Sequence, residues 1–209
     1  MLHSMNLKIE KYEKIGISKY RLYLDNGEVI DTYDDVILKN ELLLKSKLDT
    51  NLYNQIIIET NLQEHYNACI KYISIRIRSI KEIKDYLKRK NVDDDDIEYI
   101  VSKLETNKYL DDNYFCECFI KDKLKFTNWG EVKIIYELKK HNISSAIIDN
   151  NKYLMNKEIL TDKIDRIITK QIKSNHKLDN AKLRNKLYNH LINAGYTSSL
   201  VVERLNIYF

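Results

Sequence analysis

The sequence contains no proline and only four glycines among its 209 residues. Both residues disfavour helix interiors, so their scarcity favours long helices and leaves little material for a glycine-rich phosphate loop. The three cysteines are an odd and sparse set, which argues against a disulfide scaffold and fits a reducing compartment. There is no apolar run of about 18 residues and no secretory signal, so we expect a cytoplasmic protein that does not enter membranes.

Patterns typical of catalysis or metal binding are missing as well. Cys116 and Cys118 lie two residues apart on an expected helix and so face different sides, and no two histidines are paired at i, i+4. The carboxylates of residues 93–96 and of Asp111 and Asp112 precede apolar helix positions. Helix capping and the helix dipole explain these carboxylates without any chemistry. We therefore expect no metal, no cofactor and no enzymatic activity.

The first 50 residues differ in pattern from the rest of the chain. Leu7 and Ile9 alternate with polar residues, as do the apolar residues within 20–24, and residues 25–27 read Asp-Asn-Gly. This combination predicts strands around a tight β-hairpin turn. We expect residues 1–50 to form a small N-terminal unit.

Three short segments in the remainder share one local chemistry. Each has a residue that tolerates the left-handed conformation, then an apolar residue, then a helix N-capping residue. They are Asn91-Val92-Asp93, Asn142-Ile143-Ser144 and Gly195-Tyr196-Thr197, spaced 51 and 53 residues apart. Each segment predicts the end of one helix and the start of the next, so we infer one helical module used three times.

Apolar positions repeat in the same rhythm. Tyr66, Phe115 and Ile164 each begin a triplet with the spacing of one helix face, and successive triplets are 49 residues apart. Later in each module, four apolar positions are separated by 4, 5 and 5 residues. These positions are Ile83, Leu87, Val92 and Ile97; Ile134, Leu138, Ile143 and Ile148; and Leu187, Leu191, Tyr196 and Val201.

The predicted fold is mainly α: a tandem array of three three-helix modules, elongated and curved, preceded by a small N-terminal unit with a β-hairpin. The expected boundaries are residues 1–50 for the N-terminal unit and 51–107, 108–152 and 153–209 for the modules. In the second module, Gly130 is expected to open a helix that packs closely on the preceding one, with Trp129 covering the corner.

Charge is arranged in blocks, although the formal net charge is only +4. The local balance is +6 over residues 71–90, −7 over residues 91–117 and +6 over residues 152–186. Basic blocks of this kind can attract a phosphate backbone or an acidic protein surface. A solvated helix face explains them without any partner, and charge patterning discriminates only weakly between these interpretations.

Three groups of residues form a further pattern: Arg78-Ser79, Glu82-Ile83 and Leu87; Lys108-Tyr109-Leu110-Asp111-Asp112; and Gly130, Ile134, Leu138 and Asn142-Ile143. Together these residues resemble the core of the RecX regulatory family. The resemblance covers roughly residues 60–152, and residues 20–25 resemble the extension of longer members. Lys108 departs from the family pattern, which commonly has a small residue or glycine at this position.

The resemblance implies a non-catalytic protein that binds the RecA recombinase along the groove of its filament on single-stranded DNA. Such a protein modulates strand exchange and ATP hydrolysis, usually as an inhibitor, within DNA recombination, DNA repair and the SOS response. The implied partners are the RecA filament and single-stranded DNA, contacted directly or through RecA. We expect this chain to act as a monomer.

On that basis, basic side chains of the first two modules are the candidates for partner binding. They are Arg76, Arg78, Lys81, Lys84, Lys88 and Arg89, together with Lys121, Lys123, Lys125 and Lys133. Two other classes of protein remain open. A stand-alone nucleic-acid-binding helical repeat would bind DNA or RNA tightly and with a steep salt dependence, whereas a purely structural scaffold would neither bind nucleic acid nor affect a recombinase.

Overall fold

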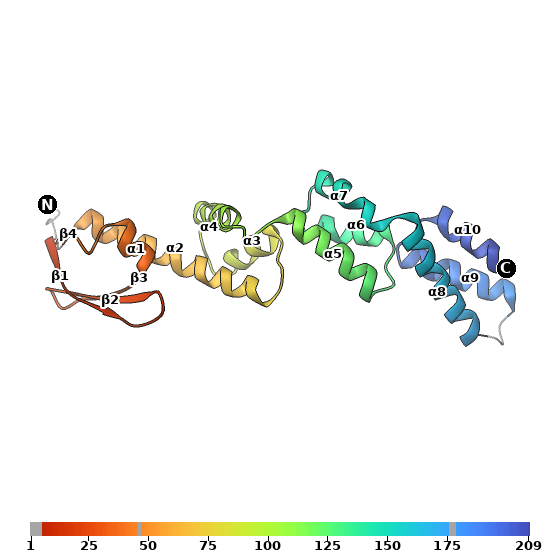
Figure 1. The fold of residues 1–209 in the computed structure, drawn as a ribbon, viewed down its shortest axis with the longest axis horizontal. Coiled ribbons are helices and arrows are strands. Elements are labelled where there is room, and N and C mark those ends of the chain that lie inside the picture. The colour runs from red at the N-terminus through yellow and green to blue at the C-terminus, as the bar shows by residue number, and fades with distance from the viewer. Residues whose placement is uncertain (1–5, 46, 176–178) are drawn as a thin grey trace. The chain divides into compact units, whose positions relative to one another are not determined.

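The structure of the chain is a computed structural model that describes residues 6–45, 47–175 and 179–209. The chain divides into two compact units, one of residues up to Arg76 with Tyr86–Tyr109, the other of Ile77–Asp85 with Leu110–Phe209. The strands are β1 (Asn6–Lys14), β2 (Lys19–Leu24), β3 (Val29–Tyr33) and β4 (Lys47–Asp49). The helices (Figure 1) are α1 (Asp34–Lys39), α2 (Thr50–Ile75), α3 (Ile80–Lys88), α4 (Asp94–Thr106), α5 (Asp112–Phe126), α6 (Glu131–Lys140), α7 (Ser145–Asn151), the 3-10 helix η1 (Lys152–Met155), α8 (Lys157–Ser174), α9 (Asn180–Asn193) and α10 (Ser198–Tyr208).

The strands form one antiparallel sheet in the order β3-β2-β1-β4. β2 and β3 are the predicted hairpin, and Gly27 in their turn has a φ of +84°, a conformation that favours glycine. β4 was not predicted, because three residues are too few to show an alternating pattern. It pairs with the start of β1, where Leu48 lies opposite Leu7.

One apolar core joins this sheet to α1 and α2. Every second residue of a strand faces the same side, so Leu22, Ile30 and Leu48 are buried together with Val36 of α1 and Ile56 of α2. Each such side chain contributes about 1.5–3 kcal/mol when fully buried. The N-terminal sheet is therefore built on the first half of the long helix α2.

The second compact unit contains two further apolar cores. Helices α5, α6, α7 and η1 surround one of them, which includes Phe115 and Ile134. Helices α8, α9 and α10 surround the other, which includes Ile164 and Leu187. Phe115 and Ile164 are the equivalent positions of the 49-residue repeat, and both are buried. The predicted mainly α fold with tandem three-helix modules and an N-terminal β unit is confirmed.

The three predicted corners all adopt the left-handed conformation, with φ of +58° at Asn91, +62° at Asn142 and +89° at Gly195. At each corner, the next N–H donates to the carbonyl five residues earlier, which is the Schellman arrangement. These bonds join Val92 to Leu87, Ile143 to Leu138 and Tyr196 to Leu191. The first five-residue spacing of the repeated pattern, as from Leu87 to Val92, is therefore the spacing between the donor and acceptor residues of this hydrogen bond.

Two more corners of this kind were not predicted. Lys108 after α4 has a φ of +59°, and Glu41 after α1 has a φ of +53°. The corresponding hydrogen bonds join Tyr109 to Leu104 and Leu42 to Ile37. Neither position carries glycine or asparagine, so sequence alone gave no sign of a left-handed residue there.

Candidate partner-binding surface

Side chains from two helices hold the start of α3. The Ser79 hydroxyl accepts from the Glu82 N–H and the Glu82 carboxylate accepts from the Ser79 N–H, both at 3.2 Å, which is a capping box. The Ile80 N–H donates to Asp112 Oδ1 at 2.9 Å. Asp111 caps its own helix, α5, as predicted, whereas Asp112 caps α3. Asp111 and Asp112, the acidic pair of the Tyr-Leu-Asp-Asp segment, thus cap the N-termini of two different helices.

Arg78 is the one candidate binding residue that the structure buries. It is 8% exposed, and its guanidinium lies 3.6 Å from the Glu82 carboxylate. A buried charge is costly without a partner, so this pair is a structural element that supports the capping box. Arg78 is therefore placed to position α3 and not to meet a partner, which corrects the expectation from charge alone.

The other first-module candidates are reached by solvent. Arg76, Lys81, Lys88 and Arg89 are exposed, and Lys84 is half-buried. Lys81 Nζ lies 2.6 Å from Asp85, and Lys88 Nζ lies 3.2 Å from Asp94. Exposed ion pairs of this kind contribute about 0–1 kcal/mol. The two lysines can therefore exchange their carboxylates for an acidic or phosphate group of a partner at little cost.

In the second module, Trp129 brings two candidate lysines together from different helices. Lys123 Nζ of α5 is 4.7 Å from the centre of the Trp129 ring, and Lys133 Nζ of α6 is 4.8 Å from it. These distances are typical of cation–π contacts. Trp129 itself is half-buried and packs against the core of α5–α7. The expected packing role of Trp129 is thus confirmed, and two lysine ammonium groups also lie over its ring.

The remaining second-module candidates lie on α5. Lys125 Nζ is 5.0 Å from the ring centre of Phe126, which is 72% exposed. Lys121 pairs with Glu117 one turn earlier on the same helix. Charge counting did not identify Phe126 or Trp129 as companions of these lysines. The alternation of aromatic and basic residues along residues 119–133 is the sequence signal that could have done so.

Helix α8 carries a further basic surface that the candidate set omits. Arg166, Lys170 and Lys173 recur at i, i+4 and i+7, and all three are exposed. With Asp165 and Thr169 they line an open hollow of about 460 Å³. The block of positive charge over residues 152–186 pointed to this helix, but only the helical spacing identifies which side chains share a face.

Lys163 on the same helix has a different environment. Its ammonium donates to the carbonyls of Leu124 and Thr127 at the end of α5, the latter at 2.7 Å. Burial lowers the pKa of Lys163, and the nearby Arg166 lowers it further. Lys163 therefore connects α8 to α5 and is not a surface charge.

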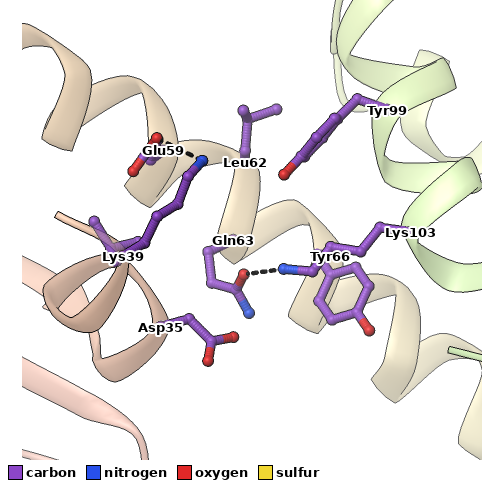
Figure 2. Close-up of a pocket in the computed structure, with 9 residues that line it drawn as sticks. Asp35, Lys39, Glu59, Leu62, Gln63, Tyr66, Tyr99 and Lys103 are labelled. Atoms are coloured by element: carbon purple, nitrogen blue, oxygen red, sulfur yellow. Dashed lines mark hydrogen bonds and ion pairs between the residues drawn. The ribbon is translucent and has the colours of Figure 1, made fainter. Parts of the chain in front are cut away.

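A small pocket in the first compact unit lies among α1, α2 and α4 (Figure 2). Its polar side chains are engaged with one another: Lys39 pairs with Glu59 at 2.7 Å, and Lys103 Nζ donates to Gln63 Oε1 at 2.9 Å. Lys103 Nζ is also 4.4 Å from the centre of the Tyr66 ring. The cavity volume is about 50 Å³, far below the roughly 300–1,000 Å³ of typical small-molecule sites. This pocket suits a few waters and not a substrate.

Within residues 6–45, 47–175 and 179–209, no three His, Cys, Asp or Glu side chains are grouped to hold a metal ion. His3 and His176 lie outside these described residues. In the same part of the chain, no helix has the length and apolar character needed to cross a membrane.

Two family models match this chain: RecX, first three-helix domain, over residues 66–104, and RecX, second three-helix domain, over residues 111–150. Regulatory protein RecX of Halalkalibacterium halodurans is 27% identical over 195 residues, which cover 91% of this chain and 73% of that protein. Regulatory protein RecX of Clostridium beijerinckii is 26% identical over 205 residues, covering 97% of this chain and 94% of that protein.

Solved structures share the fold. A crystal structure of regulatory protein RecX has a TM-score of 0.84 at 19% identity and covers 96% of this chain and 99% of its own. The crystal structure of RecX from Lactobacillus salivarius has a TM-score of 0.64 at 21% identity, covering 70% and 97%. The fold of this chain is the one seen in these structures, mainly helical with an N-terminal antiparallel sheet. The chain is thus similar to the RecX family of regulatory proteins over more than nine-tenths of its length.

Proposed function

We propose that this chain binds RecA, or the RecA filament on single-stranded DNA, and inhibits strand exchange and ATP hydrolysis. The observation that carries the proposal is the similarity to regulatory proteins RecX over more than nine-tenths of the chain, with both three-helix domains matched. The chain would act in the cytoplasm as a monomer, in DNA recombination, DNA repair and the SOS response. Its modules would occupy residues 51–107, 108–152 and 153–209, after an N-terminal unit of residues 1–50.

The solvent-reached basic residues support a contact with an acidic or phosphate-bearing partner. Nine of the ten candidates fulfil this condition, because only Arg78 is buried. Complementary charge accelerates association and fixes orientation more than it adds affinity. We propose that Arg76, Lys81, Lys84, Lys88 and Arg89, with Lys121, Lys123, Lys125 and Lys133, face RecA or the DNA that it carries.

The direct test is ATP hydrolysis by the cognate recombinase on single-stranded DNA, measured with and without this protein. We expect the hydrolysis rate to fall as the protein is added. A variant with Lys81, Lys88 and Arg89 changed to Glu should inhibit at least about tenfold less, since charge repulsion replaces attraction. The matched control changes three exposed lysines outside the candidate set, Lys47, Lys139 and Lys182, to Glu and should inhibit normally.

An unchanged rate of ATP hydrolysis over a wide concentration range would contradict the proposal. If the protein also bound naked DNA or RNA tightly and with a steep salt dependence, it would belong to the stand-alone nucleic-acid-binding class. If it did neither, the scaffold class would remain. Equal inhibition by both charge variants would contradict the assignment of the first-module residues alone.

A further inference from the structure

The end of α5 and the start of α6 present aromatic rings beside lysines. Phe126 is 72% exposed and has Lys125 over its ring, and Trp129 is half-buried between Lys123 and Lys133. A single exposed ring is common on protein surfaces and needs no explanation. Two rings three residues apart in the sequence, in contact with three lysines, are a different feature. We call these five residues the α5–α6 corner.

The loop that carries the corner is held in place from several directions. The Thr127 hydroxyl donates to the Lys123 carbonyl at 2.7 Å and accepts from the Trp129 N–H at 3.2 Å. Lys163 donates to the Thr127 carbonyl at 2.7 Å, and the Gly130 N–H donates to the Ala194 carbonyl at 2.8 Å. The rings are therefore presented on a preorganised segment. Binding there costs little ordering entropy.

The charge of the segment is complementary to an anion. Residues 119–133 contain four lysines against Asp122 and Glu131. Lysines over aromatic rings gain about 0.5–1 kcal/mol at exposed sites, so the ammonium groups can leave the rings when a stronger anionic partner arrives. The exposed ring of Phe126 and the exposed part of the Trp129 ring can then take part in stacking.

We propose that the α5–α6 corner binds single-stranded nucleic acid directly, with Phe126 stacked on a base and the ring of Trp129 against a neighbouring one. Lys123, Lys125 and Lys133 contact the flanking phosphates. Every base has a π-face, so such a contact tolerates any sequence. An acidic protein surface would use the lysines but not the rings. The inference rests on the proposed function and names residues of this chain that touch the strand itself.

Trp129 is the only tryptophan in the sequence, so its fluorescence reports on this corner. The test titrates the full chain with an oligodeoxythymidylate of about 20 nucleotides and with an abasic oligomer of equal length and charge. We expect the oligodeoxythymidylate to quench Trp129 and to bind several-fold more tightly than the abasic strand. Phe126→Leu should weaken oligodeoxythymidylate binding about tenfold and leave binding of the abasic strand unchanged. Circular dichroism of the Phe126→Leu variant is the check that this exposed substitution leaves the fold intact.

The matched control is Phe209→Leu, which removes a ring that is 38% exposed at the end of α10 and should bind like the parent. Equal affinity for both oligomers, or an unaffected Phe126→Leu variant, would overturn the proposal. Quenching by polyglutamate with no response to DNA would do the same, and would assign the corner to an acidic protein surface. Because recombinase ATP hydrolysis is measured separately, a negative result here leaves the proposed function standing if inhibition is still observed.

Discussion

The backbone of Gly130 lies directly against the backbone of Gly195. The Gly130 N–H donates to the Ala194 carbonyl at 2.8 Å, and the Val132 N–H donates to the Gly195 carbonyl at 2.9 Å. A Cβ on Gly130 would lie 2.4 Å from the Gly195 oxygen, and a Cβ on Gly195 would lie 2.4 Å from Lys133 Cβ. The start of α6 is thus docked on the corner between α9 and α10. Close packing at Gly130 was predicted from the sequence, but against the preceding helix and not against the corner between α9 and α10.

This close approach predicts that neither glycine tolerates a side chain. Gly130→Ala should destabilise the second compact unit by about 1–3 kcal/mol through the forced backbone shift. Gly195→Ala should cost more, because the left-handed conformation adds about 1–2 kcal/mol for a non-glycine residue. The free energy of unfolding in urea measures both effects. Gly16→Ala, whose Cβ would lie 3.3 Å from Lys19 Cβ, is the comparison variant and should lose less stability than either. Parental stability of either core variant would contradict the packing.

Lys108 offers the opposite prediction, a substitution that stabilises. It holds a left-handed φ of +59° without the freedom of glycine, so Lys108→Gly relieves backbone strain worth about 1–2 kcal/mol and loses part of that to the entropy of the unfolded chain. We expect a net gain of about 0.5–1 kcal/mol in thermal or urea unfolding. The control Lys170→Gly, at an exposed position inside α8, should lose about 1 kcal/mol. A loss at Lys108 as well would contradict the strained conformation.

Lys163 should contribute to stability through its two carbonyl acceptors. Lys163→Met keeps the aliphatic stem and removes the ammonium, so the carbonyls of Leu124 and Thr127 lose their donor. We expect a loss of about 0.5–1.5 kcal/mol in urea unfolding, the usual net contribution of a hydrogen bond, because all three residues are half-buried. Lys170→Met on the exposed face of α8 is the matched control and should stay within about 0.5 kcal/mol. If the two variants had equal free energies of unfolding, the hydrogen bonds from Lys163 to α5 would contribute nothing to stability.

The thiols should differ in reactivity. Burial raises the pKa of Cys69 to about 12 and that of Cys116 to about 11, and both side chains are fully buried. Cys118 is half-buried. Since the thiolate is the reactive form, a disulfide reagent at neutral to mildly alkaline pH should modify Cys118 first and the other two only on unfolding. Cys118→Ser should abolish the fast phase. Three equally fast thiols would contradict the core assignment.

The outcomes at the corners show what sequence patterns can predict. The residue types of Asn91, Asn142 and Gly195 favour the left-handed conformation and so predict a turn at each position. All three turns are confirmed. Lys108 and Glu41 make the same turn with residue types that oppose it. There the Schellman hydrogen bond overrides local preference, and after Glu41 the buried side chain of Leu42 adds to it.

The candidate surface was predictable in composition but not in contacts. Counting charges identified nine basic residues that solvent reaches, yet it also selected Arg78, whose burial beside Glu82 depends on tertiary packing. The cap that Asp112 gives to α3 and the two lysines on Trp129 join residues from different helices. Such pairings follow from how helices pack and not from spacing along one helix.

We propose that this chain recognises the recombinase filament and not only the DNA inside it. The most direct measurement is the binding of the fluorescently labelled full chain to RecA filaments on single-stranded DNA and to the same DNA without RecA, each at two salt concentrations. The account predicts tighter binding to the filament, weakening as salt rises, and a loss of at least about tenfold when Lys81, Lys88 and Arg89 are changed to Glu. Equal affinity for filament and naked DNA, or no binding to the filament, would contradict it.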